Sequence, residues 1–119
     1  MRRREGALVP LEVSILKVAM DLRGRGVIEA HGFLLAKELR EERQARRLTA
    51  YGTLYKALDR LERAGYLQSR WEDPNIGADE GRPRRRFYRI TLFGEAALAQ
   101  AIEEMGEAAL PRSAAVIST

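Results

Sequence analysis

Hydrophobic residues recur at helical spacing in four segments of the chain, and this pattern predicts four helices. The first helix begins at Pro10, and its pattern ends at the glycines of positions 24 and 26. The second helix follows the pair His31–Gly32 and leads into a turn at residues 43–48. Its apolar positions are Phe33, Leu35, Ala36 and Leu39.

The third and fourth helices carry clear apolar stripes. Thr49 is a suitable N-cap for the third helix, and Gly65 stands where a left-handed C-terminal residue is expected. The fourth helix is capped by Thr91 and stopped by Pro111. The third stripe contains Leu54, Ala57, Leu58 and Leu61, and the fourth contains Phe93, Ala97, Leu98, Ile102, Met105 and Ala109.

Alternating polarity replaces the helical repeat in two short segments, which predicts two strands. The first strand covers residues 67–71, and in the second Tyr88 and Ile90 alternate with Phe87 and Arg89. Between them, residues 72–86 contain two prolines and two glycines, which predicts a long hairpin loop without regular structure. Val27 and Ile28 are expected to form a further short extended piece.

Three helices followed by a two-stranded hairpin form the winged version of the helix-turn-helix, a mostly helical α+β fold. In this fold the third helix enters the major groove of DNA, and the hairpin forms the wing beside it. The outward face of the third helix offers side chains that donate, accept or stack, and a glycine that permits close backbone approach. The DNA contacts expected from this helix are Tyr51, Gly52, Thr53, Tyr55, Lys56 and Arg60.

Positive charge is concentrated in two stretches of the chain. The net charge is +4 and the pI is about 9.8, which favours a polyanionic partner such as nucleic acid. Residues 2–4 are all arginine and form either a DNA-binding arm or a solubilising tail. In the wing we expect Arg84, Arg85 and Arg86 to contact the minor groove or its phosphates.

The sequence lacks the residues of common catalytic and metal sites. It has no cysteine and a single histidine, His31, which we interpret as a residue that leads into the second helix. It also has no Gly-rich phosphate loop and no nucleophile beside a base, so we expect neither an enzyme nor a cofactor. No segment reaches the roughly 20 apolar residues that span a bilayer, and we expect a soluble, cytoplasmic protein.

Three motifs carry a family resemblance. They are His31-Gly32-Phe33, the stretch TAYGTLYKALDRLERAGYL at residues 49–67, and the stretch GRPRRRFYRIT at residues 81–91. In this order and spacing they closely resemble the PadR-like transcriptional regulators, over roughly residues 8–105.

The resemblance implies a homodimer that binds a palindromic operator in double-stranded DNA and acts as a repressor. It implies a DNA-binding domain at residues 1–91, a dimerisation helix at 92–110 and a disordered tail at 111–119. Some family members bind small aromatic effectors between the protomers, and an effector for this chain stays unassigned. The first helix is apolar on a second side, which a partner helix would cover, and the expected dimer contacts are Leu16, Met20, Leu98, Ile102 and Met105.

Two alternatives stay open. A winged-helix module can bind protein instead of DNA, because a fold alone does not fix a function. Trp71 is expected to pack in the hairpin rather than to form a ligand platform.

Overall fold

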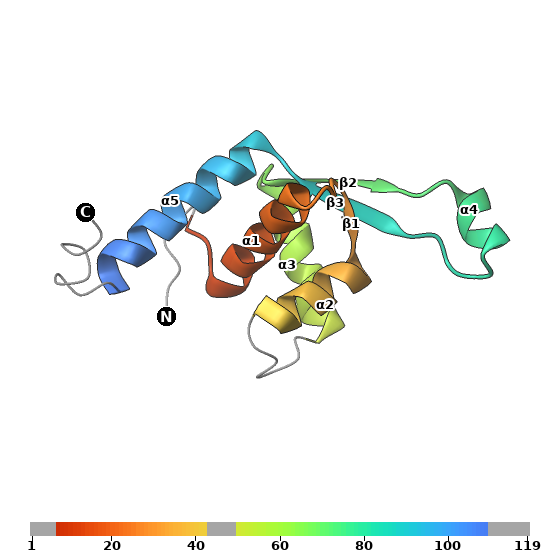
Figure 1. The fold of residues 1–119 in the computed structure, drawn as a ribbon, viewed down its shortest axis with the longest axis horizontal. Helices are drawn as coiled ribbons and strands as arrows, with labels where there is room; N and C mark the ends of the chain where they lie inside the picture. Colours follow the sequence, from red (N-terminus) through yellow and green to blue (C-terminus); the bar gives the residue numbers. More distant parts are fainter. Residues whose placement is uncertain (1–6, 43–49, 110–119) are drawn as a thin grey trace.

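The computed structural model describes residues 7–42 and 50–109, which form five helices and three strands (Figure 1). The predicted class, mostly helical α+β with a small antiparallel sheet, is confirmed. Predictions for residues 2–4, residues 43–48, Thr49 and residues 111–119 lie outside the described residues. The elements are α1 (Pro10–Gly24), β1 (Ala30–His31), α2 (Gly32–Glu42), α3 (Tyr51–Arg63), β2 (Leu67–Trp71), α4 (Pro74–Asp79), β3 (Arg86–Ile90) and α5 (Leu92–Ala109).

The three strands form one antiparallel sheet in the order β1-β3-β2. In the β2–β3 ladder Leu67 lies opposite Ile90 and Trp71 lies opposite Arg86. Leu67 and Ile90 are buried under the helices, whereas Trp71 is exposed, because the far end of the ladder leaves the body of the protein. This projecting end and α4 form the wing, which extends away from the helices (Figure 1).

Two elements differ from the prediction. The short extended piece expected at residues 27 and 28 lies instead at β1, where it pairs with β3. The wing loop, expected to be irregular, contains the six-residue helix α4. Pro74 occupies its first turn, and the Asp73 carboxylate accepts a hydrogen bond from the backbone N–H of Asn75 at 2.9 Å. Both features favour the start of a helix. The prediction gave more weight to the glycines at positions 77 and 81, which favour a loop.

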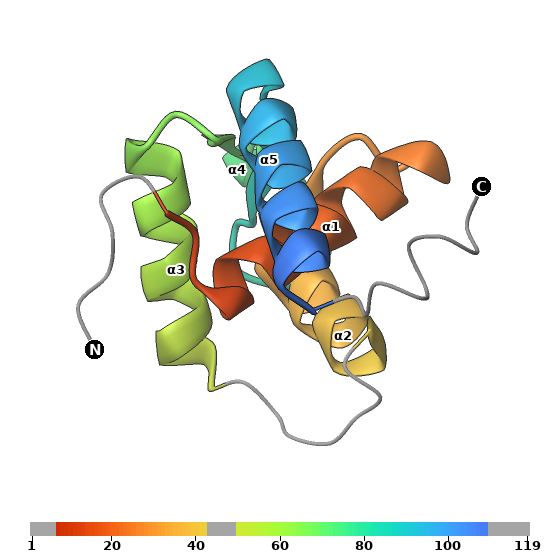
Figure 2. The same ribbon diagram turned by 90° about the vertical axis from the view of Figure 1, so that its left-hand side faces the viewer.

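Helix α1 lies at the centre of the core. Its side chains Ile15 and Leu16 are fully buried, and α2, α3, β3 and α5 all pack against it. Figure 2 shows α5 lying across α1, so the second apolar side of α1 is covered by a helix of the same chain. This corrects the expectation of a dimer contact at Leu16, because its side chain has no surface left for a partner. Met20 is half-buried beside it.

Helix α5 is fixed to the body at its N-terminal half. Thr91 caps it as predicted, because its hydroxyl oxygen accepts the backbone N–H of Gly94 at 3.0 Å. The same hydroxyl donates to the carbonyl of Gly65 at 2.6 Å, and Arg23 of α1 donates to the Glu95 carboxylate at 2.8 Å. Leu98 is 5% exposed and packs into the core, which corrects its expected dimer contact as it does that of Leu16. None of the helices in the described ranges is long and apolar enough to cross a membrane.

Candidate nucleic-acid interface

The exposed face of α3 is the one that the sequence predicted. Its apolar stripe is buried, and the N-terminal residues 51–53, 55 and 56 on the other side are all exposed. The rings of Tyr51 and Tyr55 stack with centroids 6.5 Å apart. The helix therefore presents two phenol rings, a threonine hydroxyl and a lysine ammonium together on one surface.

The hydroxyl of Tyr55 lies against the start of α2. A Cβ placed on Gly32 would overlap the Tyr55 hydroxyl and ring, so only glycine fits here without displacing the tyrosine. Phe33, expected on the buried side of α2, is instead 61% exposed and stacks on His31. The motif His31-Gly32-Phe33 thus shapes the surface beside α3, and Tyr55 packs on the protein as well as facing solvent.

A concave surface lies between α3 and the wing. It has a volume of about 450 Å³, and we call it the wing groove. Tyr55 of α3, Phe33 of α2 and Trp71 of β2 contribute aromatic side chains to it, and residues 82 and 84–86 contribute arginines. The α3 surface and the arginine-rich segment therefore border the same groove, although about 30 residues separate them in the sequence.

The arginines of the wing are not equivalent. Arg82 donates to both oxygens of the buried Glu72 carboxylate, at 2.7 and 3.0 Å, and to Glu80 at 2.7 Å. These hydrogen bonds from Arg82, with one from the backbone N–H of Arg85, lower the pKa of Glu72 to about 2. Arg82 is thereby held by two carboxylates at the base of the wing loop, and its charge is compensated.

Arg86 braces the wing against α3. Its guanidinium donates to the Glu62 carboxylate at 3.0 Å and to the Ser69 hydroxyl at 2.9 and 3.0 Å. It also lies over the rings of Trp71 and Tyr88. Arg86, expected to contact DNA like its neighbours, is therefore also paired within the chain.

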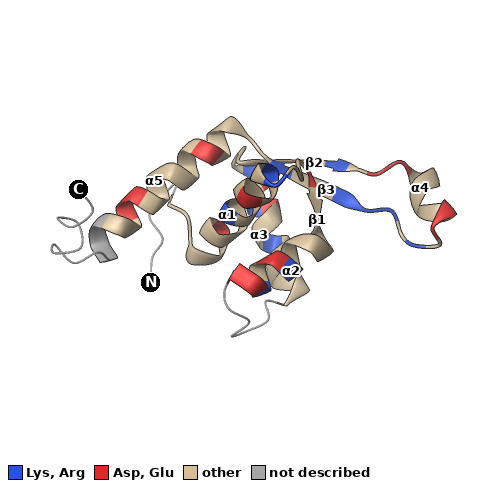
Figure 3. Ribbon diagram, in the orientation of Figure 1, with Lys and Arg blue, Asp and Glu red and all other residues tan. Residues whose placement is uncertain are grey.

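No acidic side chain of the described residues compensates the positive charges of Arg84 and Arg85. In residues 7–42 and 50–109 neither side chain forms an ion pair, and Arg84 lies 4.9 Å from the Trp71 ring centroid. The uncompensated positive charge of the wing therefore lies at residues 84 and 85, directly before β3, which we call the stem of the wing. The tip carries Asp73, Asp79 and Glu80, and Figure 3 shows this change from basic stem to acidic tip.

Arg60, expected on the positive edge of α3, ties the helix to α1. Its Nε donates to the buried carboxylate of Glu12 at 2.8 Å, and the same carboxylate accepts the backbone N–H of Val9 at 3.0 Å. The Arg60 side chain, expected to contact DNA, is therefore also paired within the chain. The pairing could not be predicted from the sequence, because Glu12 and Arg60 are 48 residues apart.

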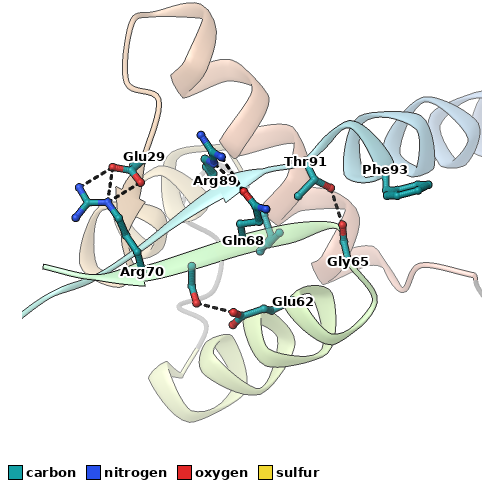
Figure 4. A pocket seen from close by; sticks show the side chains of 10 residues that line it. Glu29, Glu62, Gly65, Gln68, Arg70, Arg89, Thr91 and Phe93 are labelled. Atoms are coloured by element: carbon teal, nitrogen blue, oxygen red, sulfur yellow. Dashed lines mark hydrogen bonds and ion pairs between the residues drawn. The ribbon is translucent and has the colours of Figure 1, made fainter.

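A second pocket, of about 780 Å³, lies along β2 (Figure 4). Its polar groups pair with one another: Arg70 donates to both oxygens of Glu29, at 2.7 to 3.0 Å, and Arg89 donates to Gln68 at 2.8 and 3.0 Å. The hydrogen bonds from Arg70 also lower the pKa of Glu29. No group of acidic, histidine or cysteine side chains in the described part of the chain could hold a metal ion.

Sequence reasoning missed three residues of this interface. Trp71 lines the wing groove, Phe33 is exposed beside it, and Glu62 holds Arg86. The pairing of Trp71 with Arg86 across the hairpin was readable in principle, since it follows once the strand register is known. The contact between Glu62 and Arg86 requires the packing of α3 on the sheet.

Comparison with known proteins places this architecture in a family. Solved structures similar to the chain include a transcriptional regulator from Clostridium thermocellum, with 26% identity, 82% of each chain covered and a TM-score of 0.66. A PadR-like transcription factor from Bacteroides fragilis has 27% identity, coverage of 82% of this chain and 81% of that one, and a TM-score of 0.64.

A more distant structure shares the fold. It is Bacillus subtilis PadR in complex with operator DNA, with 18% identity, coverage of 78% of this chain and 46% of that one, and a TM-score of 0.56. Among curated proteins no match is significant. The model of the transcriptional regulator PadR-like family matches residues 24–100, which is more than half of the sequence. The chain therefore belongs to the PadR-like family of transcriptional regulators, a family of regulators and not of enzymes.

Proposed function

We propose that this protein binds double-stranded DNA and represses transcription from a palindromic operator, with α3 in the major groove and the wing stem on the adjacent minor groove or its phosphates. The observation that carries the proposal is the wing groove, where Tyr55 of α3 and Arg84 of the wing border one concave surface. A duplex brings its major and minor grooves side by side, with a phosphate strand between them. The related Bacillus subtilis protein, whose structure includes operator DNA, supports the same use of the fold.

The proposed contacts follow the exposed groups. Tyr51, Thr53 and Lys56 lie on the free face of α3. Among the described residues no atom lies within 4 Å of the place of a Cβ on the exposed Gly52, which leaves room for close backbone approach. In the wing, Arg84 and Arg85 are the cations available for phosphates, while Arg82 and Arg86 hold the wing in place.

We further propose a homodimer formed through α5, with residues 1–91 as the DNA-binding unit and 92–110 as the dimerisation helix. Leu98 is buried in the chain itself, but Ile102 and Met105 farther along the helix are 47% and 51% exposed. Two large apolar side chains one turn apart on an exposed helix favour a partner helix. A dimer would also present two copies of α3 to the two halves of a palindrome.

Selection of duplexes from a random pool, followed by affinity measurements over a salt series, tests the function. We expect selected sites with two related half-sites and an affinity that falls steeply with salt, because bound phosphates release counterions. Weak binding without any salt dependence or sequence preference would favour the alternative of a protein-binding module.

The wing arginines are expected to differ in how much each contributes to the salt dependence of DNA binding. Arg84→Gln or Arg85→Gln removes a cation that is free for a phosphate, so the slope of log affinity against log salt becomes shallower by about one per contact. Arg25→Gln is the matched control, because Asp21 and Glu38 compensate that charge and Arg25 does not line the wing groove. Equal slopes for the parent and the Arg84 and Arg85 variants would exclude these two residues as phosphate contacts.

Thr53→Ala is expected to change which sequences are bound rather than how many phosphates are contacted. A good base-edge contact contributes about 1–3 kcal/mol of discrimination, so the preference for the selected site over a mutated half-site falls with little change in salt slope. Tyr51→Ala is the companion variant on the same exposed face. If competition assays show unaltered preference in both variants, neither residue reads bases.

A further inference from the structure

Trp71 lies between two arginines on the surface of the wing groove. The Cζ of Arg84 is 4.9 Å from the centroid of its ring, and the Cζ of Arg86 is 5.4 Å from it. The ring is 52% exposed, so it fills no core position and leaves its stacked arginines accessible from the groove. A guanidinium within about 6 Å of an indole centroid is attracted by the negative face of the ring.

One of the two arginines is fixed to α3. Arg86 pairs across the hairpin with Trp71, and its guanidinium is bonded to Glu62 of α3 and to Ser69 of β2. The Ser69 hydroxyl itself donates to Glu62 at 2.6 Å. A continuous series of contacts therefore leads from α3 through Glu62, Arg86 and Trp71 to Arg84.

We propose that Trp71 is a positioning residue, which holds the guanidinium of Arg84 at a fixed place relative to α3 so that both reach one duplex together. The proposal rests on the proposed DNA-binding function and assigns Trp71 a role that the family match does not give it. Trp71 acts through Arg84 and makes no DNA contact of its own.

The kind of contact explains why an aromatic residue stands here. A carboxylate, such as Glu72 beside Arg82, orients an arginine but compensates its charge. An indole ring orients the guanidinium and leaves its full charge for a phosphate. A free arginine side chain loses rotamer freedom when it binds, and an arginine that is already ordered loses less. Trp71 therefore strengthens binding without adding a phosphate contact.

A double-mutant cycle on the selected duplex tests this role. Trp71→Leu is expected to weaken binding roughly two- to five-fold, which corresponds to the loss of one exposed cation–π contact, and to leave the salt slope unchanged. In the Arg84→Gln background the same tryptophan substitution is expected to have no further effect. Trp71→Phe retains an aromatic face and is expected to restore most of the affinity.

Two outcomes would overturn the positioning role. Equal weakening by Trp71→Leu in the parent and in the Arg84→Gln background would show that Trp71 does not act through Arg84. Unchanged affinity of Trp71→Leu would show that Arg84 needs no positioning. Failure of the parent to bind any duplex would instead refute the DNA-binding function, so the two failures are distinguishable.

A spectroscopic measurement on the free protein completes the test. Trp71 is the only tryptophan of the sequence, so its fluorescence reports on the wing alone. Arg84→Gln is expected to alter its emission in the absence of DNA, whereas Arg63→Gln, on the exposed C-terminal part of α3, is the control that leaves it unchanged. Emission that does not respond to Arg84→Gln would mean that the two side chains do not stack in solution, which overturns the proposal.

Discussion

Ile102→Glu is expected to convert the protein from a dimer to a monomer and to weaken its binding to a two-half-site duplex by roughly 10²–10⁴-fold. Ile102 is 47% exposed on α5, one turn from Met105, and the proposed partner helix would cover both. A carboxylate buried in such a contact loses its hydration without gaining a partner, which costs several kcal/mol. The DNA affinity falls because each protomer then binds its half-site alone.

Sedimentation of the variant at several concentrations measures this change. Ile76→Glu is the matched control, since Ile76 is 45% exposed and lies on α4, at the opposite end of the molecule from α5 (Figure 1). The control should sediment as the parent does. A dimer that survives the Ile102 substitution would place the protomer contact elsewhere on the chain, and a monomeric parent would remove it altogether.

Gly94→Ala is expected to lower the free energy of unfolding by about 2–3 kcal/mol, the effect of a methyl group forced into a packed contact. A Cβ on Gly94 would overlap the backbone carbonyl of Tyr66 and come within 2.8 Å of a side-chain carbon of Ile90. Backbone cannot move aside as a flexible side chain can. The start of α5 would therefore separate from the turn after α3, and the Thr91 cap would weaken with it.

Chemical denaturation followed by circular dichroism measures the loss. Gly52→Ala is the control within the same protein, because no atom of residues 7–42 and 50–109 lies within 4 Å of its Cβ position on α3. That substitution should leave stability unchanged or raise it by up to about 1 kcal/mol, since alanine is the better helix former. If both variants unfold at the same denaturant concentration as the parent, α5 is not packed on Tyr66 as described.

The parts of the fold that the sequence predicted well are those with strong local periodicity. Helix α3 is the clearest case, because Leu54, Ala57, Leu58 and Leu61 recur at the helical period and all four are buried. Thr91 and Gly65 are local end signals, and both act as predicted, Gly65 with a φ of 83°. Periodicity also predicted the order of these elements, and the family motifs supported the same fold.

The misassigned parts depend on contacts between distant segments. The second apolar side of α1 was attributed to a partner helix, and only the packed chain shows that α5 covers it. Periodicity identifies an apolar face but not its occupant. For the same reason Leu16 was predicted as an interface residue although it belongs to the core.

The pairing of charges also depends on contacts between distant segments. A run of arginines shows where cations are concentrated, but the free cations depend on acids contributed by other elements. Arg86 and Glu62 are 24 residues apart, and Arg60 and Glu12 are 48 apart. Each pair forms only after the helices and the sheet have packed, so sequence spacing alone could not separate the braces from the cations left for DNA.

Footprinting on a selected duplex tests most directly whether α3 and the wing hold the same double helix. The expected pattern is protection of guanine N7 in the major groove next to protected sugars across the adjacent minor groove, repeated in two half-sites about 10 base pairs apart. Arg84→Gln should restore reactivity at the minor-groove sugars alone, and Thr53→Ala at the major-groove bases. Protection of only one groove, or a footprint that both substitutions leave unchanged, would contradict the proposed interface.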